Sequence, residues 1–324
     1  MLVVCGGKWM SGSRGSHSLS PIPSKCSNQS LSSSSSNNYR PVVILPGLGN
    51  NSGDYLKLEQ TLNENYGLST VVAKVSRLDW LRNASGLIDP NYWRGTLEPA
   101  PVLDWYLERV NDAVEEAKEL GGGGGGDSTT TALSLIGHSA GGWLARLYMQ
   151  QFGVSHISLL LTLGTPHLPP PKGVIDQTRG LLDYVQKYCS QPVYTPQLKY
   201  VCVAGRYIEG APLFGKSNPN VEAVVPSNSS DQLLPEAAVM NAATTSFSNT
   251  TLRARFVGQG YKQVCGQADV WGDGVVPEVS AHLEGALNIS LDGVYHSPVG
   301  SDDTIRPWYG SPGVLEQWIE HLLN

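Results

Sequence analysis

The sequence has no apolar run long enough to cross a bilayer and no excess of positive charge. A transmembrane helix needs about 20 consecutive apolar residues, and no segment of the 324 residues approaches that length. The formal net charge is -6, so the chain lacks the basic surface used for nucleic-acid binding and has no electrostatic attraction to an anionic membrane. We therefore expect a soluble protein that contacts a membrane at most peripherally.

Cysteine is also scarce. Cys5 and Cys26 lie in an atypical N-terminal segment, and the remaining Cys189, Cys202 and Cys265 are an odd number without metal-ligand spacing. Cys202 stands inside an apolar run, which predicts a buried strand residue. The sequence thus predicts neither a metal centre nor another cofactor.

No aspartate or glutamate occurs before Asp54. The first 40 residues are instead rich in serine and carry four basic residues. A hydroxylated, basic and acid-free N-terminus is typical of an organelle transit peptide. We therefore interpret residues 1–40 as a disordered transit peptide and predict a chloroplast location; the alternative is a disordered tail without a targeting role.

Beyond residue 40, short apolar runs alternate with helical patterns. This alternation predicts a single α/β domain over residues 41–324, with a mostly parallel sheet, helices on both faces and ligands at the carboxyl ends of the strands. The expected strands cover residues 42–45, 70–75, 132–136, 157–163, 199–204 and 287–291, and the expected helices cover 102–120, 142–150 and 314–323.

Two long stretches interrupt the alternation, at residues 169–196 and 206–267. Long connections are often functional, and lids over an active site are the first candidate. The apolar pieces at 181–185 and 233–240 would suit a mobile lid; the alternative is that both stretches pack on the sheet edge. The glycines at 121–126 lack the Lys-Ser/Thr of a phosphate-binding loop and predict a flexible surface loop.

Ser139 is the most informative residue of the chain. It stands in Gly137-His138-Ser139-Ala140-Gly141, after a run of strand length and before a helical pattern. Such a strand, turn and helix form a nucleophile elbow, which exposes the serine oxygen above the sheet edge. Because chance alone would give about 0.4 such pentapeptides in a chain this rich in glycine and serine, the context carries the argument.

A serine hydroxyl is a poor nucleophile until an imidazole accepts its proton. His296 is the best candidate, since it follows the last expected strand and precedes the terminal helix. The other histidines fit less well: His167 comes too early, His282 precedes the last strand, and His321 lies in the terminal helix. A structural role is the alternative for His296.

The imidazole in turn needs an acid that lies between the serine and the histidine in α/β-hydrolase chain order. Asp273 is the best candidate, because the glycines on either side let the backbone turn at a strand end. A simple Asx turn is the alternative for Asp273, and Asp269 is the rival acid.

An oxyanion hole would need two backbone N–H groups. Ala140 supplies one as the residue after the serine. Leu48 supplies the other, because it follows Pro46-Gly47 at the end of the first expected strand and Gly47 permits a tight approach. A plain glycine turn is the alternative there.

The chain resembles the α/β-hydrolase lipases from about residue 42 to its end, and is most similar to plant plastid-type PGAP1-like (GPI inositol-deacylase-like) and lecithin:cholesterol acyltransferase-like proteins. The resemblance implies acyl-ester hydrolysis with Ser139, Asp273 and His296 as the triad. It departs from the family in having Pro46-Gly47 where lipases commonly have His-Gly, and in lacking the membrane spans of GPI inositol-deacylases. The matching segments are residues 46–49, 137–142, 163–167, 272–277 and 295–296.

The sequence therefore predicts a carboxylic ester hydrolase acting on lipids, through chemistry that needs neither metal nor nucleotide. A lipid acyltransferase with the same triad and a non-catalytic binding protein of this fold are the alternatives. The oligomeric state stays open. An apolar segment after the second expected strand suits either an acyl-chain surface or ordinary packing; its members are Trp80, Leu81, Leu87, Ile88, Trp93 and Trp105.

Overall fold

The computed structural model of the protein describes residues 39–121, 132–190, 194–213 and 249–324. These residues belong to one compact unit, Asn38–Asn324. The transit-peptide prediction and the second apolar piece, residues 233–240, lie outside the described residues. Both therefore stay predictions.

A six-stranded sheet in the order β2-β1-β3-β4-β5-β8 forms the centre of this unit, and every pair of neighbouring strands is parallel. The predicted α/β class and parallel sheet are confirmed. The six strands are β1 (Val42–Leu45), β2 (Thr70–Val72), β3 (Leu133–His138), β4 (Ile157–Leu163), β5 (Lys199–Arg206) and β8 (Leu287–Asp292), and the short strands β6 (Ile208–Glu209) and β7 (Trp271–Gly272) pair separately and antiparallel.

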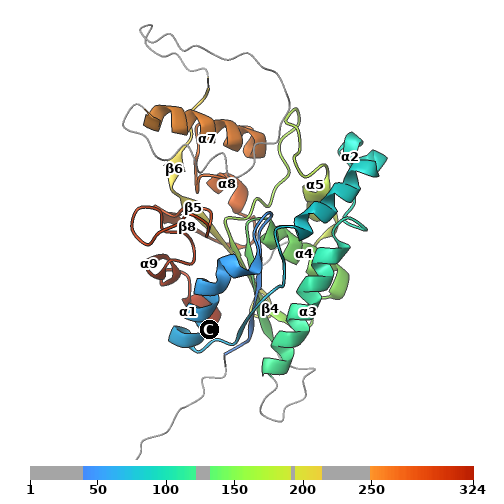
Figure 1. Ribbon diagram of the computed structural model, residues 1–324, viewed down its shortest axis with the longest axis vertical. Helices are drawn as coiled ribbons and strands as arrows, with labels where there is room; N and C mark the ends of the chain where they lie inside the picture. Colours follow the sequence, from blue (N-terminus) through green and yellow to red (C-terminus); the bar gives the residue numbers. More distant parts are fainter. Residues whose placement is uncertain (1–38, 122–131, 191–193, 214–248) are drawn as a thin grey trace, which may run out of the picture. The chain divides into compact units, whose positions relative to one another are not determined.

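Helices cover both faces of the sheet (Figure 1). Along β1, Val43 and Leu45 belong to the buried cluster that includes residues of α3, α4 and α5, whereas Val42 and Ile44 belong to the cluster that includes residues of α1, α9 and α10. All four side chains are fully buried, as the period-2 alternation of a strand covered on both faces requires. The helices are α1 (Leu56–Tyr66), α2 (Pro90–Arg94), α3 (Asp104–Gly121), α4 (Ala140–Phe152), α5 (Leu181–Tyr188), α7 (Asn249–Cys265), α8 (Glu278–Ala281), α9 (Pro312–Leu315) and α10 (Glu320–Leu323), with 3₁₀ turns η1 (Ser52–Tyr55) and η2 (Asp79–Ile88).

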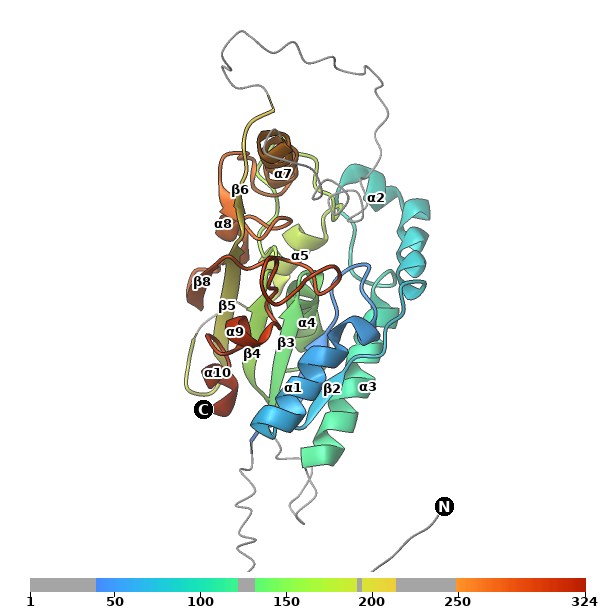
Figure 2. The same ribbon diagram turned by 60° about the vertical axis from the view of Figure 1, so that its left-hand side comes forward.

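The six expected strands and the helices α3 and α4 are present close to their expected ranges, and the other elements differ. The predicted terminal helix 314–323 is instead two short helices, α9 and α10. Between them the backbone forms 3₁₀-type hydrogen bonds, such as that from Trp318 N–H to Leu315 C=O, which interrupt the α-helical pattern. The second strand ends at Val72 rather than at residue 75, because Val75 N–H turns to the Ser52 hydroxyl. Helices α1, α2, α5, α7 and α8 and the short strands β6 and β7 were not predicted. Of these, α7 packs near α8 and β6 (Figure 2).

The first proposed lid piece, residues 181–185, packs against the domain in this structure. It begins helix α5, whose Leu181, Leu182 and Val185 are buried against the core that α4 shares with the sheet. A closed lid would cover its apolar side chains in the same way. The lid interpretation of this segment therefore stays a prediction.

Candidate active site

Ser139 lies in the sharp turn between β3 and α4, with φ 51° and ψ −127°. Such a backbone conformation is strained for a residue with a side chain, and it persists only where the surroundings hold it. Small neighbours make room for it. A Cβ added to Gly47 would stand 2.8 Å from the Ser139 Cβ, and one added to Gly142 would collide with Thr165. The predicted elbow and the predicted close approach at Gly47 are both present.

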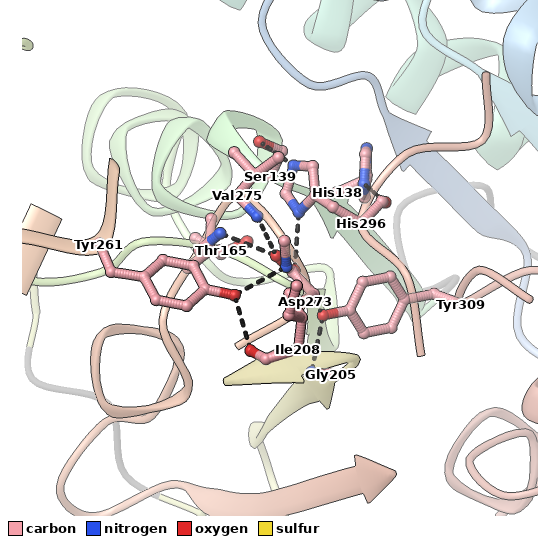
Figure 3. Close-up of polar contacts among 12 residues, drawn as sticks. His138, Ser139, Thr165, Gly205, Ile208, Tyr261, Asp273, Val275, His296 and Tyr309 are labelled. Carbon is pink, nitrogen blue, oxygen red and sulfur yellow. Dashed lines mark hydrogen bonds and ion pairs between the residues drawn. The ribbon is translucent and has the colours of Figure 1, made fainter. Parts of the chain in front are cut away.

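The three side chains selected from the sequence form one hydrogen-bonded chain (Figure 3). The distance from His296 Nε2 to Ser139 Oγ is 3.0 Å, and that from His296 Nδ1 to Asp273 Oδ2 is 2.7 Å. Both His296 and Asp273 are about 1% exposed, while Ser139 is only partly buried. The serine oxygen is thus the part of this chain that a ligand can reach.

Asp273 is held from several sides. Its Oδ1 accepts the N–H groups of Val275 (3.0 Å) and Val276 (2.7 Å), and its Oδ2 accepts the Tyr309 hydroxyl at 2.8 Å in addition to His296. These donors fix both oxygens of the buried carboxylate and leave Oδ2 directed at the imidazole.

Two tyrosines extend the support of this carboxylate. The Tyr309 hydroxyl accepts the N–H of Gly205 at 2.8 Å, which ties it to the end of β5. Tyr261 of α7 accepts the N–H of Gly274 at 2.9 Å and donates to Ile208 C=O at 3.3 Å (Figure 3). The unpredicted helix α7 therefore positions the loop that carries Asp273.

His138, which precedes the serine, is fully buried and links two loops. Its Nδ1 lies 2.7 Å from the Tyr55 hydroxyl, and its Nε2 lies 2.9 Å from the backbone oxygen of His296. Burial, and second the nearby His296, lower the pKa of His138 to about 3. The neutral ring therefore donates from Nε2 to His296 and accepts from Tyr55 at Nδ1.

The same tyrosine holds the loop after β1. Tyr55 accepts the N–H of Gly47 at 2.9 Å, and Tyr106 of α3 donates to the Pro46 carbonyl at 2.7 Å. This N–H and this carbonyl belong to one peptide unit, so buried hydroxyls from opposite faces of the sheet fix its orientation. The next N–H along the chain is that of Leu48, the predicted oxyanion donor.

The two predicted oxyanion donors flank the serine. Ala140 is the first residue of α4, where the N–H has no intrahelical acceptor. Leu48 follows Gly47, which lies against Ser139. Neither N–H group donates to a protein oxygen within the described ranges. Both are therefore available to a negatively charged oxygen at the elbow.

The rejected alternatives lie elsewhere. His167 is fully buried, with Nε2 3.0 Å from Thr162 Oγ1. His282 lies 3.4 Å from the Ser290 hydroxyl, and His321 is in α10. Asp269 is exposed and has no hydrogen bond to His296. The structure thus brings together Ser139, Asp273 and His296 and none of these rivals.

Sequence reasoning missed the supporting residues: His138, Tyr55, Tyr106, Tyr261 and Tyr309. Only His138 carried a local signal, since it stands inside the elbow pentapeptide. The tyrosines come from four distant segments, and their spacing gives no indication that they converge.

Within residues 39–121, 132–190, 194–213 and 249–324, no group of three histidine, cysteine or acidic side chains is placed to hold a metal ion. No helix in that part of the chain is long and apolar enough to span a membrane. Cys202 is fully buried in β5, as predicted.

A model of the PGAP1-like alpha/beta domain family matches residues 100–255. The match includes the elbow at Ser139 but neither Asp273 nor His296. With the parallel sheet, the elbow and this match together, the architecture is identified. The chain has the α/β-hydrolase fold. The expected PGAP1-like resemblance is confirmed over the matched residues, whereas the plant plastid-type grouping stays a prediction.

Solved α/β-hydrolase structures show low identity to this chain, and a search of curated protein sequences found no match. A lipase from Bacillus licheniformis, BlEst2, is 13% identical, with 89% of this chain and 93% of that chain covered and a TM-score of 0.43. A monoacylglycerol lipase from Paleococcus ferrophilus is 15% identical, with 88% and 96% covered and a TM-score of 0.36. The poly(3-hydroxybutyrate) depolymerase LpqC from Bordetella parapertussis is 16% identical, with 81% and 75% covered and a TM-score of 0.37.

Replacing Tyr55 by phenylalanine removes the acceptor of Gly47 N–H and the donor to His138. Each buried polar group left without a partner costs about 1–3 kcal/mol, so we expect Tyr55→Phe to lower the free energy of unfolding by about 2 kcal/mol or more in urea titrations. Tyr148→Phe is the matched control, because it loses one longer, part-buried bond to Asn111. Equal stability losses in the two variants would contradict the assigned role of Tyr55.

Acid should destabilise the fold through its buried histidines. The pKa of His138 is lowered to about 3, and burial lowers that of His167 well below its usual value. Below about pH 6.5 these two histidines bind protons in the unfolded chain but stay neutral in the folded protein. The free energy of unfolding therefore falls as the pH is lowered, by up to about 1.4 kcal/mol per pH unit for each histidine. Urea midpoints between pH 7.5 and 5.5 should therefore decrease steadily. A midpoint that stays constant over this range would refute the buried neutral histidines.

Proposed function

We propose that this protein is a serine hydrolase that cleaves carboxylic esters. The observation that carries the proposal is the hydrogen-bonded order Ser139 Oγ, His296 Nε2, His296 Nδ1, Asp273 Oδ2 at a nucleophile elbow. In this order an imidazole can accept the serine proton while a carboxylate fixes its tautomer and stabilises its positive form.

The reaction begins with attack of Ser139 Oγ on the ester carbonyl carbon. His296 Nε2 accepts the serine proton as the new C–O bond forms, and Asp273 stabilises the resulting imidazolium. The carbonyl oxygen becomes an oxyanion that the Leu48 and Ala140 N–H groups bind. When the tetrahedral intermediate collapses, His296 returns the proton to the leaving alcohol and an acyl-serine remains.

Water then completes the cycle. His296 removes a proton from the water molecule as it attacks the acyl-serine. When the second tetrahedral intermediate collapses, His296 returns this proton to Ser139 Oγ, the bond between this oxygen and the acyl carbon breaks, and the carboxylic acid leaves. If an alcohol takes the place of water, the same groups transfer the acyl chain to it. An acyltransferase is therefore the second candidate, and product analysis with a competing alcohol separates the two.

We further propose that the substrate is a lipid ester presented at a surface. Leu78, Leu81, Ile88 and Trp93 are between 69% and 88% exposed, although Trp80 and Trp105 of the same segment are buried. Large apolar side chains grouped on a surface commonly mark an interaction site. The four exposed side chains support the expected acyl-chain surface and peripheral membrane contact. The two buried tryptophans support ordinary packing instead.

A hydrogen bond connects this exposed segment to the loop that carries Leu48. The Trp80 indole donates to the Asn50 carbonyl at 2.8 Å, and Asn50 closes the loop that carries Leu48. Leu48 itself is 55% exposed. The exposed Leu48 and the exposed apolar side chains of η2 and α2 are therefore connected through the hydrogen bond between Asn50 and Trp80, which supports the proposal.

Loss of the nucleophile should abolish turnover without loss of the fold. We expect Ser139→Ala to lower kcat on p-nitrophenyl butyrate by roughly 10³ to 10⁶, and His296→Ala to cost about as much, since the two side chains act as one unit. Asp273→Asn should cost more than about 100-fold, whereas the exposed matched control Asp269→Asn should be neutral. A folded Ser139→Ala protein with near wild-type kcat would indicate a binding protein rather than an enzyme.

The apolar surface can be tested separately from the chemistry. Burying two leucine-sized side chains contributes about 3–6 kcal/mol, so the double substitution Leu81→Ser, Ile88→Ser should lower activity on esters in neutral phosphatidylcholine vesicles by at least tenfold. Activity on monomeric p-nitrophenyl butyrate should be unchanged. Leu120→Ser, an exposed change at the end of α3, is the control. If the double variant retains full activity on vesicles, η2 and α2 are not the lipid-facing surface.

A further inference from the structure

Arg146 of α4 is a buried cation without an ionic partner. It is only 4% exposed, and its Nε makes no hydrogen bond. It takes part in none of the ion pairs formed by the part of the chain that the structure describes. The Arg146 side chain does hydrogen-bond Tyr200, but this partner carries no charge at neutral pH. Because a charge is expensive to remove from water, a buried guanidinium with only a neutral partner favours the binding of an anion.

The titratable groups around Arg146 do not supply that anion. Burial raises the pKa of Tyr200 to about 12 and those of the Cys189 and Cys202 thiols to about 11, and Arg146 opposes these rises only in part. Burial also lowers the pKa of His167 well below its usual value. At neutral pH all four groups are uncharged, so the positive charge of Arg146 is not compensated by them.

Arg146 lines a cavity of about 150 Å³ between α4 and the segment that leads into β5. The other residues that line it are the polar Gln150, Ser190, Thr195 and Tyr200 and the apolar Met149, Val154 and Leu198. An engineered cavity of about 150 Å³ holds benzene, a molecule of six heavy atoms. Arg146 lies six residues beyond Ala140, or about 9 Å along the helix, so the cavity is separate from the elbow.

We propose that this cavity binds the carboxylate group of a small, partly apolar acid. The guanidinium pairs with the carboxylate, a Tyr200 or Ser190 hydroxyl donates to it, and the three apolar side chains cover a short alkyl portion. Butyrate, with six heavy atoms, matches the volume. The fully hydrated tetrahedral charge of inorganic phosphate suits this mixed lining less well. The site does not depend on the proposed hydrolase function.

Isothermal titration of the full-length protein with butyrate tests the proposal. The expected result is one saturable site that the uncharged butan-1-ol does not fill and for which phosphate is at least tenfold weaker. Arg146→Met should weaken butyrate binding at least tenfold while leaving the urea midpoint of the free protein equal or higher, since it removes an uncompensated buried charge. Arg82→Met, an exposed arginine on η2, is the matched control and should bind butyrate normally.

Two further variants test the cavity independently of the folding of Arg146→Met. Val154→Trp retains Arg146 but adds bulk at the half-exposed edge of the cavity, so it should weaken butyrate binding even if Arg146→Met does not fold. Ser139→Ala should bind butyrate normally, because product binding at the elbow is a different site. The absence of saturable binding, equal affinity in Val154→Trp, loss of binding in Ser139→Ala, or tighter binding of phosphate than of butyrate would each overturn the proposal.

Discussion

The buried carboxylate of Asp273 is the constraint on which the arrangement of this site depends. A charged group that is about 1% exposed must find its hydrogen bonds within the protein. Here two backbone N–H groups, the Tyr309 hydroxyl and the His296 ring supply them. These donors come from three segments: the Asp273 loop itself, the loop of His296 and the segment of Tyr309. One buried charge therefore holds the three segments together.

A second network holds the other side of the elbow. It runs from Gly47 through Tyr55 and His138 to the backbone of His296, and Tyr106 fixes the same loop from the opposite face of the sheet. The loop after β1, the elbow after β3 and the loop after β8 are therefore connected through His138, which stays neutral near pH 7 because burial lowers its pKa to about 3. Pre-positioned N–H groups of this kind stabilise a developing oxyanion without reorganisation during the reaction.

The sequence was sufficient for the sheet and for the three central side chains, because each carries a local signature. Buried strands appear as apolar runs, the elbow needs small residues around Ser139, and chain order limits where Asp273 and His296 can lie. It was insufficient for α1 and α7, because polar and small residues outnumber apolar ones in both helices and no clear apolar stripe is visible. Tyr55, Tyr106 and Tyr309 act through contacts between distant segments, which no local pattern records.

Covalent labelling tests the central claim, that Ser139 is an activated nucleophile, most directly. The folded protein is treated with a fluorophosphonate, digested, and analysed by mass spectrometry. We expect a single adduct on the peptide that contains Ser139, and far slower labelling when His296 is replaced by alanine, because the serine then has no proton acceptor. Folded protein that stays unlabelled, or labelling at another serine at the same rate in both proteins, would contradict it.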